Sequence, residues 1–228
     1  KADVNEIDNV KEEKKAVVKF NLSLKQNEEK IFEKIVKNFT LKEEIEENKF
    51  REDVKAVYEE FETEKENDIS SMSFEQIKED STKWWKEIWE TSDVTIDGDE
   101  ENQQGIRFCI FQLFQTYHGA VKGTNIGAKG LTGEAYNGNA FWDTETYCLP
   151  FFLFNNKEAA QNLLYFRYKT LDEARKRAKA LDCEGAFYPI ATISGRECCN
   201  LWQHASLQLQ ASTAVAYGIW FYEKLYHD

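Results

Sequence analysis

The N-terminal part of the chain contains a short stretch in which apolar and polar residues alternate. Four apolar side chains fall on one face of this stretch: Val18, Phe20, Leu22 and Leu24. Alternation of this kind predicts a β-strand over residues 16–24. Residues 30–39 fit a strand or a helix equally well. Two strands do not make a stable sheet alone, so any strands here need further partners.

The pattern then becomes helical. Between residues 43 and 66 an apolar stripe recurs every three to four positions: Phe50, Val54, Val57, Tyr58 and Phe61. A second helix is predicted to begin after Ser73, where Ser73 and Gln76 form a capping box. Its apolar stripe continues through Trp84, Trp85, Ile88 and Trp89. We interpret this stripe as core packing.

The second half alternates helices with long loops. Helices are predicted over residues 102–119, 157–181 and 207–226, and an apolar segment over 147–154 is interrupted by Pro150. The first of these helices has little polar face and is expected to be buried on most sides. Long loops separate them at 123–145 and 182–204. This order predicts helical hairpins stacked around an axis, with the loops gathered at one end.

The first long loop is unusual in composition. Five of the eleven glycines of the chain lie between Gly123 and Glu145, and the loop ends on Trp142-Asp143-Thr144-Glu145. It also carries large apolar side chains, which a flexible linker would lack. We therefore expect an ordered loop that presents an aromatic side chain and acids at a fixed place.

The composition excludes some classes of function. Apolar residues make up 42% of the chain and there are two prolines, which suits a helical protein with a real core. Residues 1–100 carry 17 Lys and Arg against 29 Asp and Glu, whereas residues 101–228 carry 12 of each. The net charge of −12 thus lies in the first part, which we interpret as a solvated helical surface. An acidic chain repels phosphate backbones, so no nucleic-acid partner is expected.

The cysteines and the absence of long apolar runs suggest where the protein works. Of the five cysteines, Cys198 and Cys199 are adjacent, which suits neither an ordinary disulfide nor a zinc site. Cys109 and Cys148 lie in apolar runs and are expected to be core residues. A reducing, cytoplasmic location and no membrane span are predicted. Because the chain begins at Lys1 and not at Met, a fragment is expected.

Asp143 and Glu145 are the first candidates for chemistry. They stand two residues apart, so on a helix they would not share a face, and an acid/base pair is not expected. Two interpretations stay open: Asp143 caps a helix and Glu145 complements its dipole, or both bind a ligand. The neighbouring Trp142 favours a sugar, because an indole packs on pyranose C–H groups while a carboxylate accepts from hydroxyls.

A second candidate cluster is Trp202, Gln203 and His204. His204 could serve as an acid or base, although a single histidine is more often structural. Cys198 or Cys199 as a nucleophile would need a base, and none stands at a recognisable spacing. The glycine loop also lacks the order of a nucleotide-binding loop. A complete catalytic set is therefore not visible from the residues alone.

The phrase IGAKGLTGEAYNGNAFWDTETYCLPFFLF resembles the signature of glycoside hydrolase family 65, with support from WKEIWETSDVTIDGD before it and GAFYPIATISGRECCNLWQHASLQLQ after it. The resemblance implies a mainly α chain that forms about four of the twelve helices of an (α/α)6 toroid. Residues 1–40 would be the end of an N-terminal β-sandwich and residues 41–100 a helical linker. Residues 101–228 would begin the catalytic domain.

The same resemblance implies an inverting phosphorylase that splits an α-linked glucosyl disaccharide with inorganic phosphate, without a cofactor or metal. Trp142, Asp143 and Glu145 would bind the glucosyl unit, and Trp202, Gln203 and His204 would border the released sugar. The WQH sequence is more similar to kojibiose than to maltose phosphorylases. A homodimer is expected for the full-length enzyme.

The chain departs from the family pattern in two ways. Asn139 stands where the family commonly has His, which removes an ionisable group and could weaken glucose binding. The general acid of the family is expected after Asp228, so no catalytic residue is assigned within this chain and the fragment alone is expected to be inactive. The alternatives are a sugar-binding or assembly module without catalysis, and a family hydrolase that uses water.

Overall fold

The computed structural model describes residues 8–12, 15–19, 22–32, 72–131, 133, 135–199 and 203–228. The chain divides into two compact units, Lys1–Lys78 and Glu79–Asp228. The helix predicted over residues 43–66 and most of the ambiguous segment 30–39 lie outside the described residues. The expected division at residues 40 and 100 stays a prediction.

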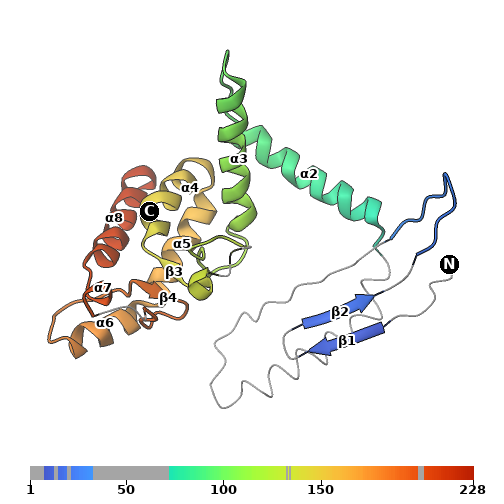
Figure 1. Cartoon of the computed structure of the whole chain (residues 1–228). Helices are drawn as coiled ribbons and strands as arrows, with labels where there is room; N and C mark the ends of the chain where they lie inside the picture. Colours follow the sequence, from blue (N-terminus) through green and yellow to red (C-terminus); the bar gives the residue numbers. More distant parts are fainter. Residues whose placement is uncertain are drawn as a thin grey trace. The chain divides into compact units, whose positions relative to one another are not determined.

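The first unit contains an antiparallel pair of strands. β1 (Asp8–Glu12) pairs with β2 (Lys15–Lys19) in a register that places Val10 opposite Val17 (Figure 1). The strand predicted over residues 16–24 therefore forms but ends at Lys19. Leu22 and Leu24 lie beyond it, exposed and outside regular structure. That this pair belongs to a larger sandwich remains a prediction.

Helix α2 (Phe74–Ser92) begins where the capping signal predicts. The hydroxyl oxygen of Ser73 accepts a hydrogen bond from the backbone N–H of Gln76 at 3.2 Å. Near the end of the helix, three tryptophans and an isoleucine pack partly buried against the main core: Trp84, Trp85, Ile88 and Trp89. The interpretation of this stripe as core packing is confirmed.

Helix α3 (Glu100–Thr116) follows a turn at Gly98, whose φ of +81° glycine adopts without a steric penalty. The carboxylate of Asp99 caps the helix by accepting from the N–H of Asn102 at 2.9 Å. The expectation that this helix is buried on most sides is wrong, because Phe108 is 59% exposed. Cys109, expected in the core, is exposed too. The helix buries one face against α4 and part of another against α2, and nothing described covers the remainder.

The main core lies between α4 (Leu149–Asn155), α5 (Lys157–Lys169) and α8 (Gln210–Tyr226), which pack together (Figure 1). Pro150 stands in the first turn of α4, where its missing N–H needs no partner, so it begins the helix and does not interrupt it. Gly218 lets α8 approach closely, because a Cβ there would lie 2.7 Å from a methyl group of Leu149.

The long helix predicted over residues 157–181 is two helices, α5 and α6 (Leu171–Ala180), separated at Thr170. The hydroxyl of Thr170 donates to the carbonyl of Phe166 at 3.0 Å, and Thr170 leaves the helical conformation. The second long loop presses on this break: a Cβ at Gly195 would lie 2.7 Å from that of Thr170. Tertiary contact thus accompanies a break that the amphipathic pattern does not show.

The two long loops are joined by a short sheet. β3 (Ala140–Phe141) in the first loop pairs antiparallel with β4 (Ala191–Thr192) in the second. The first loop also contains the tight turn η1 (Ala135–Gly138) and the short helix η2 (Thr144–Cys148), and α7 (Gln203–Ser206) follows the second loop. The described residues are mainly helical, as predicted, and the loops meet at one place as expected. The complete toroid stays a prediction.

Candidate functional site

A cavity of about 380 Å³ lies where the two long loops meet. The first loop contributes Tyr136, Asn137, Asn139, Phe141 and Trp142, and the second loop with its following residues contributes Ile190, Ala191, Cys198, Cys199, Ala205 and Gln208. The β3–β4 pairing positions both walls, because it fixes Phe141 opposite Ala191. The result is a mainly apolar hollow with a few amide side chains, which is the usual character of a small-ligand site.

Trp142 forms an aromatic wall of this cavity. The indole is half-buried and packs against a small apolar cluster that includes Tyr188, Ile190 and Val215. Its ring lies 6.2 Å from that of Tyr147. An indole fixed in this way offers a flat apolar face to a ligand with little loss of side-chain entropy on binding.

Asp143 does not cap a helix. It precedes η2 with αR backbone angles (φ −54°, ψ −33°), and its carboxylate makes no capping hydrogen bond. Its side chain is exposed and, among the described residues, has no hydrogen-bond or ion-pair partner. Of the two interpretations that the sequence leaves open, capping by Asp143 is therefore not observed. Asp143 follows the cavity residue Trp142 in the chain but does not itself line the cavity.

Glu145 is buried and fully engaged. Its two carboxylate oxygens accept from Nε and Nη2 of Arg167 at 2.7 and 2.9 Å, and both side chains are about 1% exposed. Both oxygens are thus already bound within the protein. The role of Glu145 in contacting a sugar stays a prediction. The contact that is observed, with Arg167, orders the chain around Glu145.

Arg167, on α5, was not singled out by the sequence. Its Nη2 also donates to the carbonyl of Phe141 at 3.3 Å, so one guanidinium holds the residues on both sides of Trp142 and Asp143. The backbone carbonyl of Arg167 in turn accepts from the hydroxyl of Tyr188 in the second loop at 3.0 Å. The only available signal was a lone arginine within the apolar sequence LLYFRY, where a buried charge requires a partner.

A strained turn in the first loop shapes the same wall as Trp142. Tyr136, Asn137 and Gly138 all adopt left-handed angles, with φ of 63°, 53° and 70°. Left-handed non-glycine residues cost free energy and concentrate at functional sites. The turn places the Tyr136 ring edge-on to Phe141, with centroids 5.4 Å apart. It also buries Asn139, whose side-chain amide donates to the carbonyl of Tyr136 at 2.8 Å.

Glu197 organises the second loop. Its carboxylate accepts from the backbone N–H groups of Ile190, Ala191 and Cys199 at 2.9, 3.2 and 3.0 Å, and it pairs with Arg177. Burial opposes ionisation, but the hydrogen bonds from Arg177 and the backbone outweigh it, so the pKa of Glu197 lies below its ordinary value. The sequence pattern did not single out Glu197, although it holds the backbone N–H of Cys199.

The second predicted cluster is only partly described. Trp202 lies outside the described residues, and of His204 only the backbone, within α7, is described. Gln203 begins α7 and is exposed. Ala205 and Gln208, immediately after this cluster, stand on the cavity wall. The structure therefore brings this segment to the same cavity as Trp142, and the roles of the three residues stay predictions.

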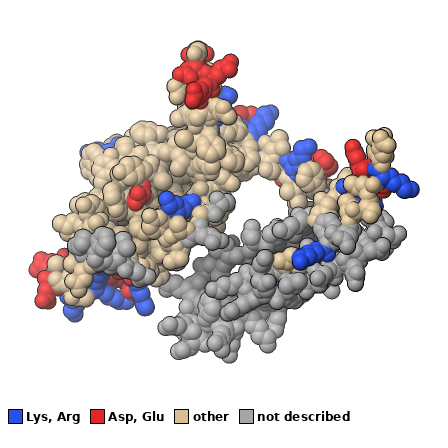
Figure 2. Space-filling model, viewed as in Figure 1, with Lys and Arg blue, Asp and Glu red and all other residues tan. Residues whose placement is uncertain are grey.

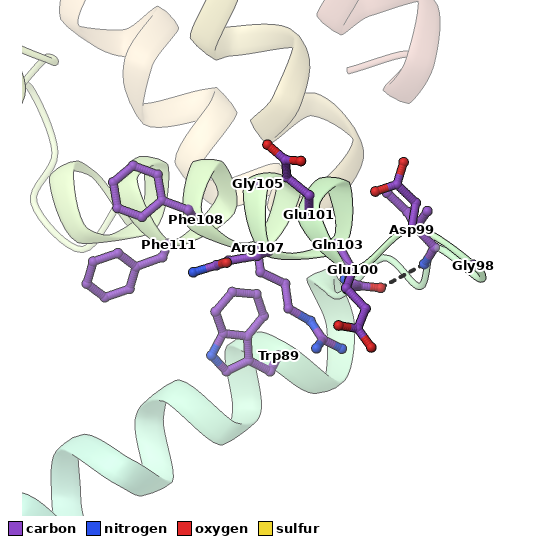
Figure 3. A pocket seen from close by; sticks show the side chains of 12 residues that line it. Trp89, Gly98, Asp99, Glu100, Glu101, Gln103, Gly105, Arg107, Phe108 and Phe111 are labelled. Atoms are coloured by element: carbon purple, nitrogen blue, oxygen red, sulfur yellow. Dashed lines mark hydrogen bonds between the residues drawn. The ribbon is translucent and has the colours of Figure 1, made fainter.

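Another cavity, of about 750 Å³, lies between α2 and α3. Figure 3 shows the Trp89 indole beside Arg107, with Phe108 and Phe111 further along α3. Two of its polar side chains are already used: Arg107 binds Asp93 at 2.8 and 2.6 Å, and Gln103 bonds the backbone of Ile96 and Val94. This hollow offers few free convergent groups and is not our candidate site.

The surface and the remaining composition give few further signs of a ligand. Acidic side chains gather where α3 begins, at Glu100 and Glu101 (Figure 2). Within the described part of the chain, no cluster of three or more His, Cys, Asp or Glu side chains could hold a metal ion. No described helix has the length and apolarity needed to cross a membrane. The expected absence of a metal or cofactor stays a prediction.

The chain resembles known phosphorylases in sequence. It is 44% identical to the maltose phosphorylase of Bacillus subtilis over 68% of this chain and 21% of the relative. It is 43% identical to the α,α-trehalose phosphorylase of Geobacillus stearothermophilus, over 66% of this chain and 20% of the relative. It is 35% identical to the kojibiose phosphorylase of Caldanaerobacter subterraneus, over 71% of this chain and 22% of the relative. The chain thus spans about a fifth of the length of these relatives.

A solved structure agrees with these relatives. A chain assigned as a kojibiose phosphorylase from the human microbiome matches with a TM-score of 0.66 and 50% identity, over 80% of this chain and 23% of that one. Residues 107–228, which contain the whole cavity wall, match the glycosyl hydrolase family 65 central catalytic domain. The chain therefore belongs to glycosyl hydrolase family 65.

Proposed function

We propose that this chain is part of an inverting disaccharide phosphorylase, which uses inorganic phosphate to split an α-linked glucosyl disaccharide into β-glucose 1-phosphate and a free sugar. The observation that carries this proposal is the cavity that joins Trp142 to the second loop, in a chain whose relatives are maltose, trehalose and kojibiose phosphorylases.

In this proposal the cavity holds the glucosyl unit. The Trp142 indole packs on the apolar face of the pyranose, and the exposed carboxylate of Asp143 accepts hydrogen bonds from its hydroxyls. Arg167 and Glu145 act by holding these two residues in position. The segment with Trp202, Gln203 and His204 borders the sugar that is released.

The remaining chemistry would come from elsewhere in the whole enzyme. Inverting cleavage needs a carboxylic acid to protonate the leaving oxygen, and in a phosphorylase the phosphate replaces the water that an inverting hydrolase activates. Glu145, the acid two residues after Asp143, is bound to Arg167 and is therefore not free to act as its acid/base partner. We therefore assign sugar binding to this chain, and the proton donor and phosphate site to other parts of a full-length, homodimeric enzyme.

The decisive experiment incubates the full-length enzyme separately with kojibiose, maltose, nigerose and trehalose, with and without phosphate. NMR then identifies the products. Phosphate-dependent formation of β-glucose 1-phosphate from one disaccharide is expected. Release of glucose without phosphate would instead establish a hydrolase, and sugar binding without turnover would establish a binding module. Asp143→Asn serves as the matched variant, with Asp172→Asn on the exposed face of α6 as control.

A further inference from the structure

We propose that Cys198 and Cys199 form a thiol-modification site inside the sugar cavity, at which a low-molecular-weight disulfide adds reversibly and excludes the sugar. The inference rests on the proposed function, because that function says what the cavity holds. Both residues line the cavity, across from the loop that carries Trp142. Neither is in a disulfide; Cys198 is exposed and Cys199 is half-buried.

The backbone beneath the two thiols is fixed. The N–H of Cys198 donates to the carbonyl of Ala191 at 2.8 Å, and the N–H of Cys199 donates to Glu197 at 3.0 Å. Ala191 in turn belongs to the sheet that joins the two loops. A group attached to either sulfur is therefore tethered to backbone that stays at the cavity wall. In side-chain rotamers that turn the sulfur inward, it occupies space that a ligand of the 380 Å³ cavity would need.

The two thiols are more suited to reaction with an external partner than with each other. Consecutive Cα atoms lie about 3.8 Å apart, which is shorter than the separation of about 4.4–6.8 Å usual across a disulfide. In the exchange reaction, a thiolate attacks one sulfur of the external disulfide. A mixed disulfide forms, the S–S bond of the reagent breaks, and its other half leaves as a thiolate. A reducing thiol reverses the reaction.

The other three cysteines provide internal controls. Cys109 and Cys183 are exposed, and neither lines the cavity that contains Trp142. Their modification should therefore leave sugar binding unchanged. Burial, with smaller contributions from Glu145 and Asp143, raises the pKa of Cys148 to about 11. A thiol with such a pKa is largely protonated near neutral pH and reacts slowly.

The test uses the full-length enzyme with Cys109→Ser and Cys183→Ser, treated with dithionitrobenzoate, an aromatic disulfide whose released thiolate is coloured. Peptide mass spectrometry locates the adducts. Calorimetry measures binding of the disaccharide that the untreated enzyme binds. We expect adducts at Cys198 or Cys199, sugar binding weakened at least about tenfold, recovery with dithiothreitol, and slower labelling when sugar is present. Adding Cys198→Ser and Cys199→Ser should abolish the difference between treated and untreated protein.

Two outcomes would overturn the inference while leaving the proposed function intact: the two thiols stay unlabelled in the folded protein, or the labelled protein binds sugar as tightly as the untreated one. Failure of the proposed function is distinct, because the untreated enzyme would then bind none of the disaccharides. In that case the part of the inference that says the adduct excludes a sugar would fail together with the proposed function.

Discussion

The guanidinium of Arg167 binds the carboxylate of Glu145 through two hydrogen bonds of 2.7 and 2.9 Å, and both side chains are buried. The same guanidinium reaches the carbonyl of Phe141 at 3.3 Å. Trp142 and Asp143 lie between these two attachment points. The position of the proposed sugar-binding pair therefore depends on a residue of α5 that never needs to touch a sugar.

Arg167→Met should strongly destabilise the protein, because it leaves the Glu145 carboxylate buried without a partner. Removing one member of a buried ion pair costs about 3–5 kcal/mol. Urea unfolding measures the loss. The control Arg175→Met breaks an exposed pair with Asp172 and should cost less than about 1 kcal/mol.

The double variant Glu145→Leu/Arg167→Met separates stability from positioning. It removes both charges, so the free energy of unfolding should recover part of the loss of Arg167→Met. Sugar binding should be weak in both Arg167→Met and the double variant, because each lacks the link from Arg167 to the Phe141 carbonyl. If binding recovers together with stability, the ion pair is only structural.

Trp142→Ala should weaken disaccharide binding by about tenfold or more, because it removes the aromatic wall of the cavity. Trp142→Phe should retain part of the affinity. Calorimetry measures both. Trp220→Ala, at a 54% exposed position on α8, is the matched control and should bind normally. Equal losses in the two alanine variants would contradict the assignment of Trp142.

Asp143→Asn in the full-length enzyme should lower kcat/KM by about a hundredfold or more, because charged contacts to sugar hydroxyls strengthen toward the transition state. The folded structure should be unaffected, since the Asp143 carboxylate has no partner among the described residues. Steady-state kinetics and a thermal melt test both statements. Near wild-type kinetics would remove Asp143 from the sugar site.

The second loop should lose stability in acid. The pKa of Glu197 is lowered in the folded protein from its ordinary 4.5, so its contribution is fully present above that value and is lost as the pH falls through the lower, folded pKa. When the melting temperature is measured at a series of pH values, it should decrease as the pH is lowered below about 4.5. In Glu197→Gln this component should disappear. A profile identical to that of the wild type would show that other carboxylates dominate.

The chain by itself should self-associate. α8 exposes Tyr217, Ile219 and Trp220 by 46%, 52% and 54%, and Phe154 on α4 is 69% exposed. Their exposed rings lie close together, with Phe154 and Tyr217 each packed on Phe221. Apolar patches of this kind promote association. Sedimentation velocity should show species larger than a monomer, reduced by Trp220→Lys. A monodisperse monomer that melts cooperatively would contradict this.

The sequence by itself predicted several local elements and singled out the first loop as an ordered loop with a candidate binding role. The capping residue Ser73 and the aromatic stripe of α2 are local signals, because each acts through neighbours within a few positions. The glycine-rich composition before Trp142 likewise indicated an ordered loop with a binding role. These features depend on spacing along the chain, which a sequence contains.

Only the tertiary structure decided which residues meet. The break at Thr170 accompanies the close approach of Gly195, and the buried role of Glu145 depends on Arg167, 22 residues away. Likewise, the β3–β4 pairing brings Cys198 and Cys199 to the cavity of Trp142. A carboxylate binds a sugar or an arginine according to what surrounds it in space. That neighbourhood is set by packing between distant segments, which the local pattern of residues does not contain.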